Sequence, residues 1–201
     1  MMDVKKSPPA HSEGLPRVGA AISPLASLSM RSGSVVLGPI LPEDTGSIFL
    51  WLNDVESIVL DLPYRPVDWM NYNGWLEDFS KNPSQVIFAI RLIHDPKIIG
   101  FVVFVEISAV HRSAKFGIRI GAETDRSKGY GKEAIRLALT YAWKHLNLNR
   151  VRLSVFDSNR RAIAAYRAAG FQHEGTLREA AYINGGWTDV VLMGALRSQS
   201  P

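Results

Sequence analysis

Hydrophobic positions recur along this chain with two different periods, and each period predicts a different kind of element. Runs rich in β-branched and aromatic residues, bounded by turn-forming residues, are typical of strands. The strands expected on this basis are 34–40, 86–92, 98–107, 115–120, 151–155, 171–177 and 188–196. The sequence His-Asp-Pro-Lys at 94–97 separates the second run from the third. It predicts a turn, so these two runs are expected to form an antiparallel hairpin.

Elsewhere the apolar period lengthens to that of a helix. The clearest example follows Gly129, where one apolar stripe consists of Ile135, Ala138, Leu139, Ala142 and Leu146. Helices are also expected after the segment 42–44, over residues 69–81, and from the Asp-Ser-Asn cap at 157–159 to a stop at Gly170. This order of elements predicts an α+β or mixed α/β domain with a largely antiparallel sheet.

The patterned part of the chain begins near residue 34. Residues 1–33 are rich in Pro, Ser, Gly and Ala and show no period, which predicts a flexible N-terminal tail. The remainder, 34–201, is long enough for one substantial core and too short for two comfortable domains. We therefore expect a single domain over 34–201.

Composition removes several classes of chemistry. The 201 residues contain no cysteine, which excludes disulfides, thiolate metal sites and an acyl-cysteine intermediate. No apolar run approaches the roughly 18 residues of a membrane span, so a cytoplasmic protein without a membrane partner is expected. The net charge of +4 suits an acidic ligand, but it also suits an ordinary soluble protein. No metal site and no nucleic-acid-binding signature is expected, and the sequence leaves a homodimer open.

The strongest chemical signal lies between the fourth strand and the helix that follows it. Arg126, Ser127, Lys128, Gly129, Tyr130 and Gly131 precede that helix directly. Glycines let the backbone approach an anion, the helix start offers free N–H groups and a positive dipole, and the two cationic side chains add charge-assisted contacts. This hexapeptide predicts a pyrophosphate cradle.

Two familiar nucleotide motifs do not fit this cradle. A Rossmann fingerprint has its first glycine at the end of a strand, yet eight residues separate Ile120 from Gly129. The acidic residue expected about 20 positions later is also missing, because Asp157 follows only after 28 residues. The P-loop pattern is absent as well. Taken alone, the two glycines leave a plain tight turn open.

A second motif, about thirty residues further along the chain, indicates which family the cradle resembles. Arg126-x-x-Gly129-x-Gly131 is followed by Asn159-x-x-Ala162-Ile163-x-x-Tyr166-x-x-x-Gly170-Phe171. The two motifs, in this order and spacing, resemble the GNAT acetyltransferase superfamily. The segment from Glu174 through Asp189 is similar to the branch that contains ribosomal-protein N-terminal acetyltransferases and spermidine N-acetyltransferases. The resemblance covers roughly residues 35–196.

The resemblance implies a fold and a donor. It implies a mixed, mostly antiparallel sheet of about six to seven strands, with helices on both faces and a splayed parallel strand pair that holds acetyl-CoA. The backbone near Ile118 and Ile120 would then bind the pantetheine amides, and residues 126–131 the pyrophosphate. Asn159 would contact the pantetheine arm, although a plain helix cap explains it equally well.

The resemblance also implies direct attack of a neutral amine on the thioester, with no covalent enzyme intermediate. Tyr166 would protonate the departing thiolate, although an aromatic residue on an apolar helix face is usually a core residue. Glu106, near the end of its strand, is a candidate for the base that deprotonates the amine. A solvated carboxylate at a strand end is the alternative for Glu106.

The acceptor is defined least. Asp61 and Tyr64, in the loop expected to cover the acceptor site, are the candidate acceptor-binding residues. This loop offers one carboxylate beside Arg65, which attracts a polycation only weakly. We therefore rank a protein N-terminus or a small-molecule amine above a polyamine such as spermidine. A non-catalytic CoA-binding regulatory module and a basic nucleic-acid-binding protein are the alternatives from other classes.

Overall fold

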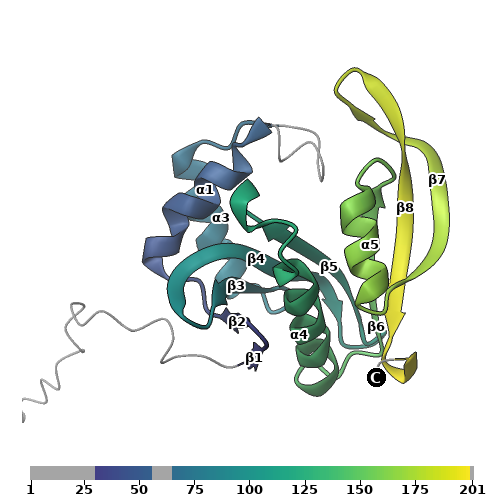
Figure 1. The fold of residues 1–201 in the computed structure, drawn as a ribbon, viewed down its shortest axis with the longest axis horizontal. Helices are drawn as coiled ribbons and strands as arrows, with labels where there is room; N and C mark the ends of the chain where they lie inside the picture. Colours follow the sequence, from purple (N-terminus) through teal and green to yellow (C-terminus); the bar gives the residue numbers. More distant parts are fainter. Residues whose placement is uncertain (1–29, 56–64, 200–201) are drawn as a thin grey trace, which may run out of the picture.

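The computed structural model describes residues 30–55 and 65–199 (Figure 1). The first half contains β1 (Met30–Ser32), β2 (Val35–Gly38), α1 (Thr45–Leu52), α3 (Trp69–Lys81), β3 (Val86–Leu92) and β4 (Asp95–Ser108). The second half contains β5 (Ser113–Ile120), α4 (Tyr130–Lys144), β6 (Arg150–Phe156), α5 (Arg160–Ala168), β7 (Gln172–Ile183) and β8 (Gly186–Leu196). Short 3-10 turns occupy Pro42–Asp44, Glu123–Asp125 and Arg197–Gln199.

The strands form one sheet in the order β1-β2-β3-β4-β5-β6-β8-β7, and its described pairs are antiparallel except β5 with β6. The expected mixed, mostly antiparallel sheet is confirmed. The expected count of six to seven strands was too low, because the described sheet has eight. The additional strand, β1, pairs Met30 with Leu37 and lies within the segment expected to be a tail. Three residues are too short a run to show a period in the sequence.

The parallel pair separates after its first residues. Pairing between β5 and β6 covers Ser113 with Arg150 through Lys115 with Arg152. Beyond this point β5 continues to Ile120 along β4, and β6 continues to Phe156 along β8. The splayed pair implied by the family resemblance is therefore present, and it leaves backbone groups on the facing edges without a neighbouring strand.

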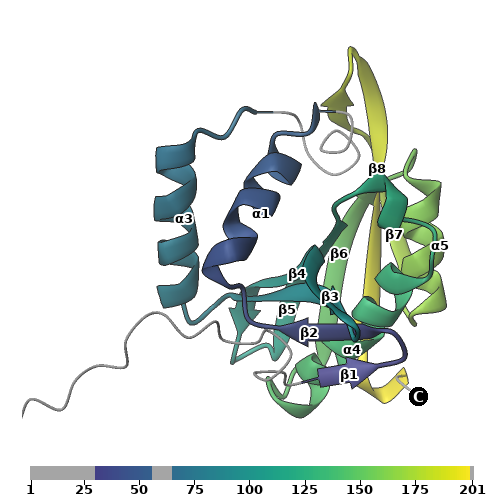
Figure 2. The same cartoon turned by 60° about the vertical axis from the view of Figure 1, so that its left-hand side comes forward.

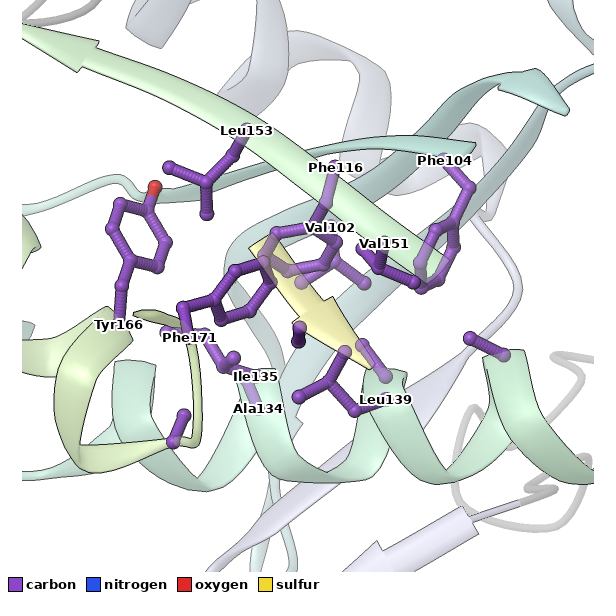
Figure 3. Close-up of a cluster of buried hydrophobic side chains, with 14 of the residues drawn as sticks. Val102, Phe104, Phe116, Ala134, Ile135, Leu139, Val151, Leu153, Tyr166 and Phe171 are labelled. Atoms are coloured by element: carbon purple, nitrogen blue, oxygen red, sulfur yellow. The ribbon is translucent and has the colours of Figure 1, made fainter. Parts of the chain in front are cut away.

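Helices cover both faces of the sheet. Figure 2 shows α1 and α3 on one face and α4 and α5 on the other. The larger core lies under α4 and α5, and Figure 3 shows part of it, including Val102, Phe104, Phe116, Ile135, Leu139 and Phe171. A smaller core under α1 and α3 contains Ile48, Tyr72, Ala89, Ile98 and Phe101. Alternation along β4 sends neighbouring side chains to opposite cores.

The start of α1 is fixed by a buried ion pair. Arg91 of β3 is fully buried and donates hydrogen bonds to the Asp44 carboxylate and to the carbonyl oxygens of Pro39 and Pro96. Asp44 also accepts a hydrogen bond from the Leu41 N–H at 2.7 Å. Each charged group therefore has several partners, as a buried charge requires.

The other end of α1 packs on the end of β5. A Cβ added to Gly121 would lie 1.9 Å from Cε2 of Trp51, so the indole lies directly on this glycine. Arg119 of β5 donates a hydrogen bond to the Trp51 carbonyl oxygen at 3.1 Å. The helix layer on this face is thus attached to β5, the strand that borders the splayed gap.

Candidate functional site

A cavity of about 190 Å³ lies beside β5, between the β5–α4 loop and α5. Its wall consists of Ile118, Arg119, Ile120, Asp125, Arg126, Ser127, Gly129, Gly131, Lys132, Ile135, Asn159, Arg161, Ala162, Ala165 and Tyr166. These residues come from β5, the loop, α4 and α5, so the cavity lies on the side where β5 and β6 diverge. The structure thereby brings together most residues that the two sequence motifs indicated.

The loop backbone adopts a conformation that suits anion binding. Ser127 and Gly129 have positive φ angles of 63° and 88°. Gly129 is the N-cap of α4 and makes no side-chain capping bond. The first N–H groups of α4 therefore donate no hydrogen bond to a capping side chain, and together with the positive helix end they form an anion-binding concavity.

The Arg126 side chain has a role in the loop that the sequence did not indicate. Its guanidinium donates hydrogen bonds to the carbonyl oxygens of Ile120 at 3.3 Å and Gly121 at 2.6 Å. These bonds fold the loop back onto the end of β5. Lys128 has its amino nitrogen 4.0 Å from an Asp125 carboxylate oxygen. Lys128 and Tyr130 do not belong to the described cavity wall.

Asn159 is the N-cap residue of α5 and also lines the cavity. Its side chain accepts a hydrogen bond from the Ala162 N–H at 3.1 Å, which caps α5. The same residue is 8% exposed and lines the cavity. The capping bond fixes the Asn159 side chain at the entrance of α5, beside the splayed gap.

Tyr166 is part of the cavity wall. It is 7% exposed, and its ring centre lies 5.7 Å from that of Phe171. Figure 3 shows the ring projecting from α5 with its hydroxyl group toward Leu153 of β6. Tyr166 therefore packs as a core residue along its ring, and it also borders the cavity.

Glu106 does not belong to this wall. It has a positive φ of 54° at an irregularity in the β4–β5 pairing, and its carboxylate forms an ion pair with Arg152 of β6. Arg152 belongs to the last parallel pair before the strands diverge. Of the other predicted site residues, Asp61 and Tyr64 lie outside the described residues.

Seven wall residues were not among the predicted site residues: Arg119, Asp125, Lys132, Ile135, Arg161, Ala162 and Ala165. Arg161 could have been found from helical spacing, because it lies four residues before Ala165 on α5. Alternation along β5 does not predict Arg119, since its neighbours Ile118 and Ile120 already occupy the opposite face. All three consecutive residues of this strand end line the cavity.

Residues 30–55 and 65–199 contain no group of three or more His, Asp or Glu side chains arranged to hold a metal ion. No helix in those ranges is long and apolar enough to cross a membrane. The cavity beside β5 combines the anion cradle with the gap between the strand edges of β5 and β6.

This arrangement fits an elongated ligand with a phosphate group at one end. The cradle would take the phosphates, and the strand edges of β5 and β6 would bind amide groups. The family model described as "Acetyltransferase (GNAT) domain" matches residues 34–172. The chain belongs to the GNAT acetyltransferase family.

The relatives are acetyltransferases as well. The chain is 40% identical over 148 residues to the spermidine N(1)-acetyltransferase of Vibrio cholerae, covering 73% of this chain and 82% of that protein. It is 32% identical over 108 residues to a putative ribosomal N-acetyltransferase of Bacillus subtilis, covering 54% of this chain and 58% of the relative.

A solved structure extends the likeness to the whole domain. The crystal structure of spermidine N-acetyltransferase from Vibrio cholerae in complex with CoA and spermine matches with a TM-score of 0.77 at 28% identity. The match covers 84% of this chain and 98% of that one. The expected fold, donor and reaction class are confirmed: the protein is an acetyl-CoA-dependent N-acetyltransferase.

Proposed function

We propose that the acceptor is the primary amine of an aliphatic polyamine. The observation that supports this most directly is the 40% identity to a spermidine N(1)-acetyltransferase along 82% of that relative. This proposal reverses the order suggested by the acceptor loop, in which a polyamine ranked below a protein N-terminus. The cytoplasm stays the predicted compartment.

A protein N-terminus is the second candidate, and a feature of the charges favours it. The carboxylates of Glu106, Asp157 and Glu174 each form an ion pair with an arginine. A carboxylate already paired attracts a polycation less than an isolated one does. The similarity to a putative ribosomal N-acetyltransferase supports the same candidate.

The residues of this chain have separate tasks in the proposed reaction. The N–H groups at the start of α4 would hold the pyrophosphate, and Asn159 would orient the pantetheine arm. The thioester of acetyl-CoA supplies the activated acyl group. Tyr166 would donate its phenolic proton to the departing thiolate sulfur, and the amine proton would leave to solvent or to a base.

The acceptor is tested by measuring thiol release from acetyl-CoA with spermidine, butylamine and a peptide carrying a ribosomal-protein N-terminus. We expect kcat/KM for spermidine to exceed that for butylamine at least about tenfold, because a second ammonium group adds charge-assisted contacts. A peptide that outperforms spermidine would instead establish the second candidate. Equal values for spermidine and butylamine would contradict polyamine recognition.

Self-association also remains a proposal. A spermidine N-acetyltransferase from Vibrio cholerae, solved as a dodecamer, matches this chain with a TM-score of 0.71 at 28% identity. We propose that this chain assembles at least into the homodimer that its sequence left open. Light scattering during size-exclusion chromatography measures the mass directly, and a monomer at micromolar concentration would contradict the proposal.

A further inference from the structure

Several cationic side chains near the cavity are already engaged with the protein. Arg126 donates to two backbone carbonyl oxygens, and Lys128 lies near Asp125. Arg160, the first residue of α5, donates to an Asp157 carboxylate oxygen at 3.0 Å. These three cations therefore hold local structure in place.

Two cations of the cavity wall differ from them. Lys132 in the first turn of α4 and Arg161 in the first turn of α5 both line the cavity. Within the described ranges neither side chain has an ion pair or hydrogen bond with the protein. Arg161 is exposed and Lys132 is half-buried, so each can meet a ligand at the rim of the cavity.

The charge of the wall exceeds what a diphosphate group alone requires. The wall contains the cations Arg119, Arg126, Lys132 and Arg161, and one described carboxylate, Asp125. The loop N–H groups and the dipole of α4 already provide a place for the diphosphate. Arg161 lies on α5, across the cavity from the β5–α4 loop. Its guanidinium group can bind a phosphate through two parallel hydrogen bonds.

We propose that Arg161, assisted by Lys132, binds the 3′-phosphate of the donor and makes the enzyme select CoA over 3′-dephospho-CoA. The inference rests on acetyl-CoA as the donor and adds a recognition step at its nucleotide end. A phosphomonoester carries up to two negative charges and has three acceptor oxygens, which match a guanidinium and an ammonium group from facing helices.

Isothermal titration of the full chain with CoA and with 3′-dephospho-CoA tests this inference. We expect wild type to bind CoA about tenfold more tightly, as one charge-assisted contact to phosphate predicts. Arg161→Gln should bring the ratio of the two dissociation constants close to one while leaving 3′-dephospho-CoA affinity unchanged. Lys132→Gln should lower the same ratio by a smaller factor.

Arg160→Gln is the matched control, because Arg160 is the neighbouring arginine and does not belong to the cavity wall. It should keep the wild-type ratio. The inference is overturned if Arg161→Gln weakens both ligands equally, since this would place Arg161 on the diphosphate, or if the ratio stays unchanged. If wild type binds neither ligand, the donor assignment fails and the inference fails with it.

Discussion

A substitution at Tyr166 can separate the packing role of the ring from the catalytic role proposed for the hydroxyl group. Tyr166→Phe keeps the ring, whose centre lies 5.7 Å from that of Phe171, and removes the hydroxyl group proposed as the acid. We expect kcat to fall about 100-fold, the low end of what a general acid contributes, because the thiolate would leave unprotonated. Thiol-release kinetics measure kcat, and titration should give an unchanged dissociation constant for CoA. An unchanged kcat would show that Tyr166 is a packing residue and not the general acid.

The ion pair between Glu106 and Arg152 allows a structural role of Glu106 to be distinguished from a role as the base. Both side chains are about half exposed, at 55% and 49%, and such ion pairs contribute roughly 0–1 kcal/mol. Their place at the start of the splay favours a structural role over the base role considered for Glu106. We expect Glu106→Gln and Arg152→Gln to lower kcat by the same small factor, about threefold at most.

The pH profile of kcat distinguishes the two roles of Glu106. A structural pair leaves the acid limb of the profile in place in both variants, because the group that titrates is another one. If Glu106→Gln alone removed the acid limb, the carboxylate would be the base. Circular dichroism of both variants controls for a general loss of fold.

Helices were the elements that the sequence predicted best. The bounds expected for α3, residues 69–81, are the bounds observed, and α5 ends before Gly170, which has a φ of 104°. Caps and apolar stripes are local, so a single segment contains the information. The β3–β4 turn was placed less well. Asp95 already belongs to β4, since register shifts around Arg91 lengthen the hairpin.

The attachment of α3 to α1 predicts a pH-dependent stability. Tyr72 of α3 is fully buried and donates its hydroxyl hydrogen to the Thr45 carbonyl oxygen at 2.9 Å. Burial, with a smaller effect of the Asp44 charge, raises the pKa of Tyr72 to about 12. The unfolded chain loses this proton near pH 10, before the folded protein does. Stability from Tyr72 is therefore complete below pH 10 and decreases as the pH rises toward 12.

Urea unfolding of wild type and Tyr72→Phe at pH 8 and pH 11 measures this effect. At pH 8 we expect the variant to be less stable by about 1 kcal/mol, because the Thr45 carbonyl loses its partner. The wild-type advantage should then shrink with pH by up to about 1.4 kcal/mol per unit above pH 10, so the two curves converge. Parallel curves would contradict the raised pKa.

At the scale of the whole molecule, the sequence indicated candidate residues for donor binding, but it did not indicate which distant residues are in contact. Arg91 pairs with Asp44 across 47 positions, and Arg152 pairs with Glu106 across 46. Such contacts depend on strand order, which the local pattern does not encode. The cavity wall follows the same logic: its motifs are local, whereas Arg119 belongs to the wall because the fold places β5 and α5 around one cavity.

Because the proposed donor site is lined by residues of β5, the loop, α4 and α5, donor binding should stabilise the folded chain as a unit. At 100 times its dissociation constant a ligand adds about 2.7 kcal/mol, which for a chain of this size raises Tm by roughly 5–11 °C. Gly131→Ala is the informative variant. Its added Cβ would meet only Ile120 Cγ1 at 3.7 Å, so the folded state tolerates it.

Gly131 and Ile120 both line the cavity, so the added methyl group would occupy space at the cavity wall. Without ligand, Gly131→Ala should melt at or slightly above the wild-type temperature, since alanine favours a helix by up to about 1 kcal/mol. With acetyl-CoA at the same concentration, its increase in Tm should be well below that of wild type. Thermal melts with and without acetyl-CoA measure the Tm of the free protein and the increase in Tm on binding. Equal increases in the two proteins would show that the start of α4 does not face the bound donor.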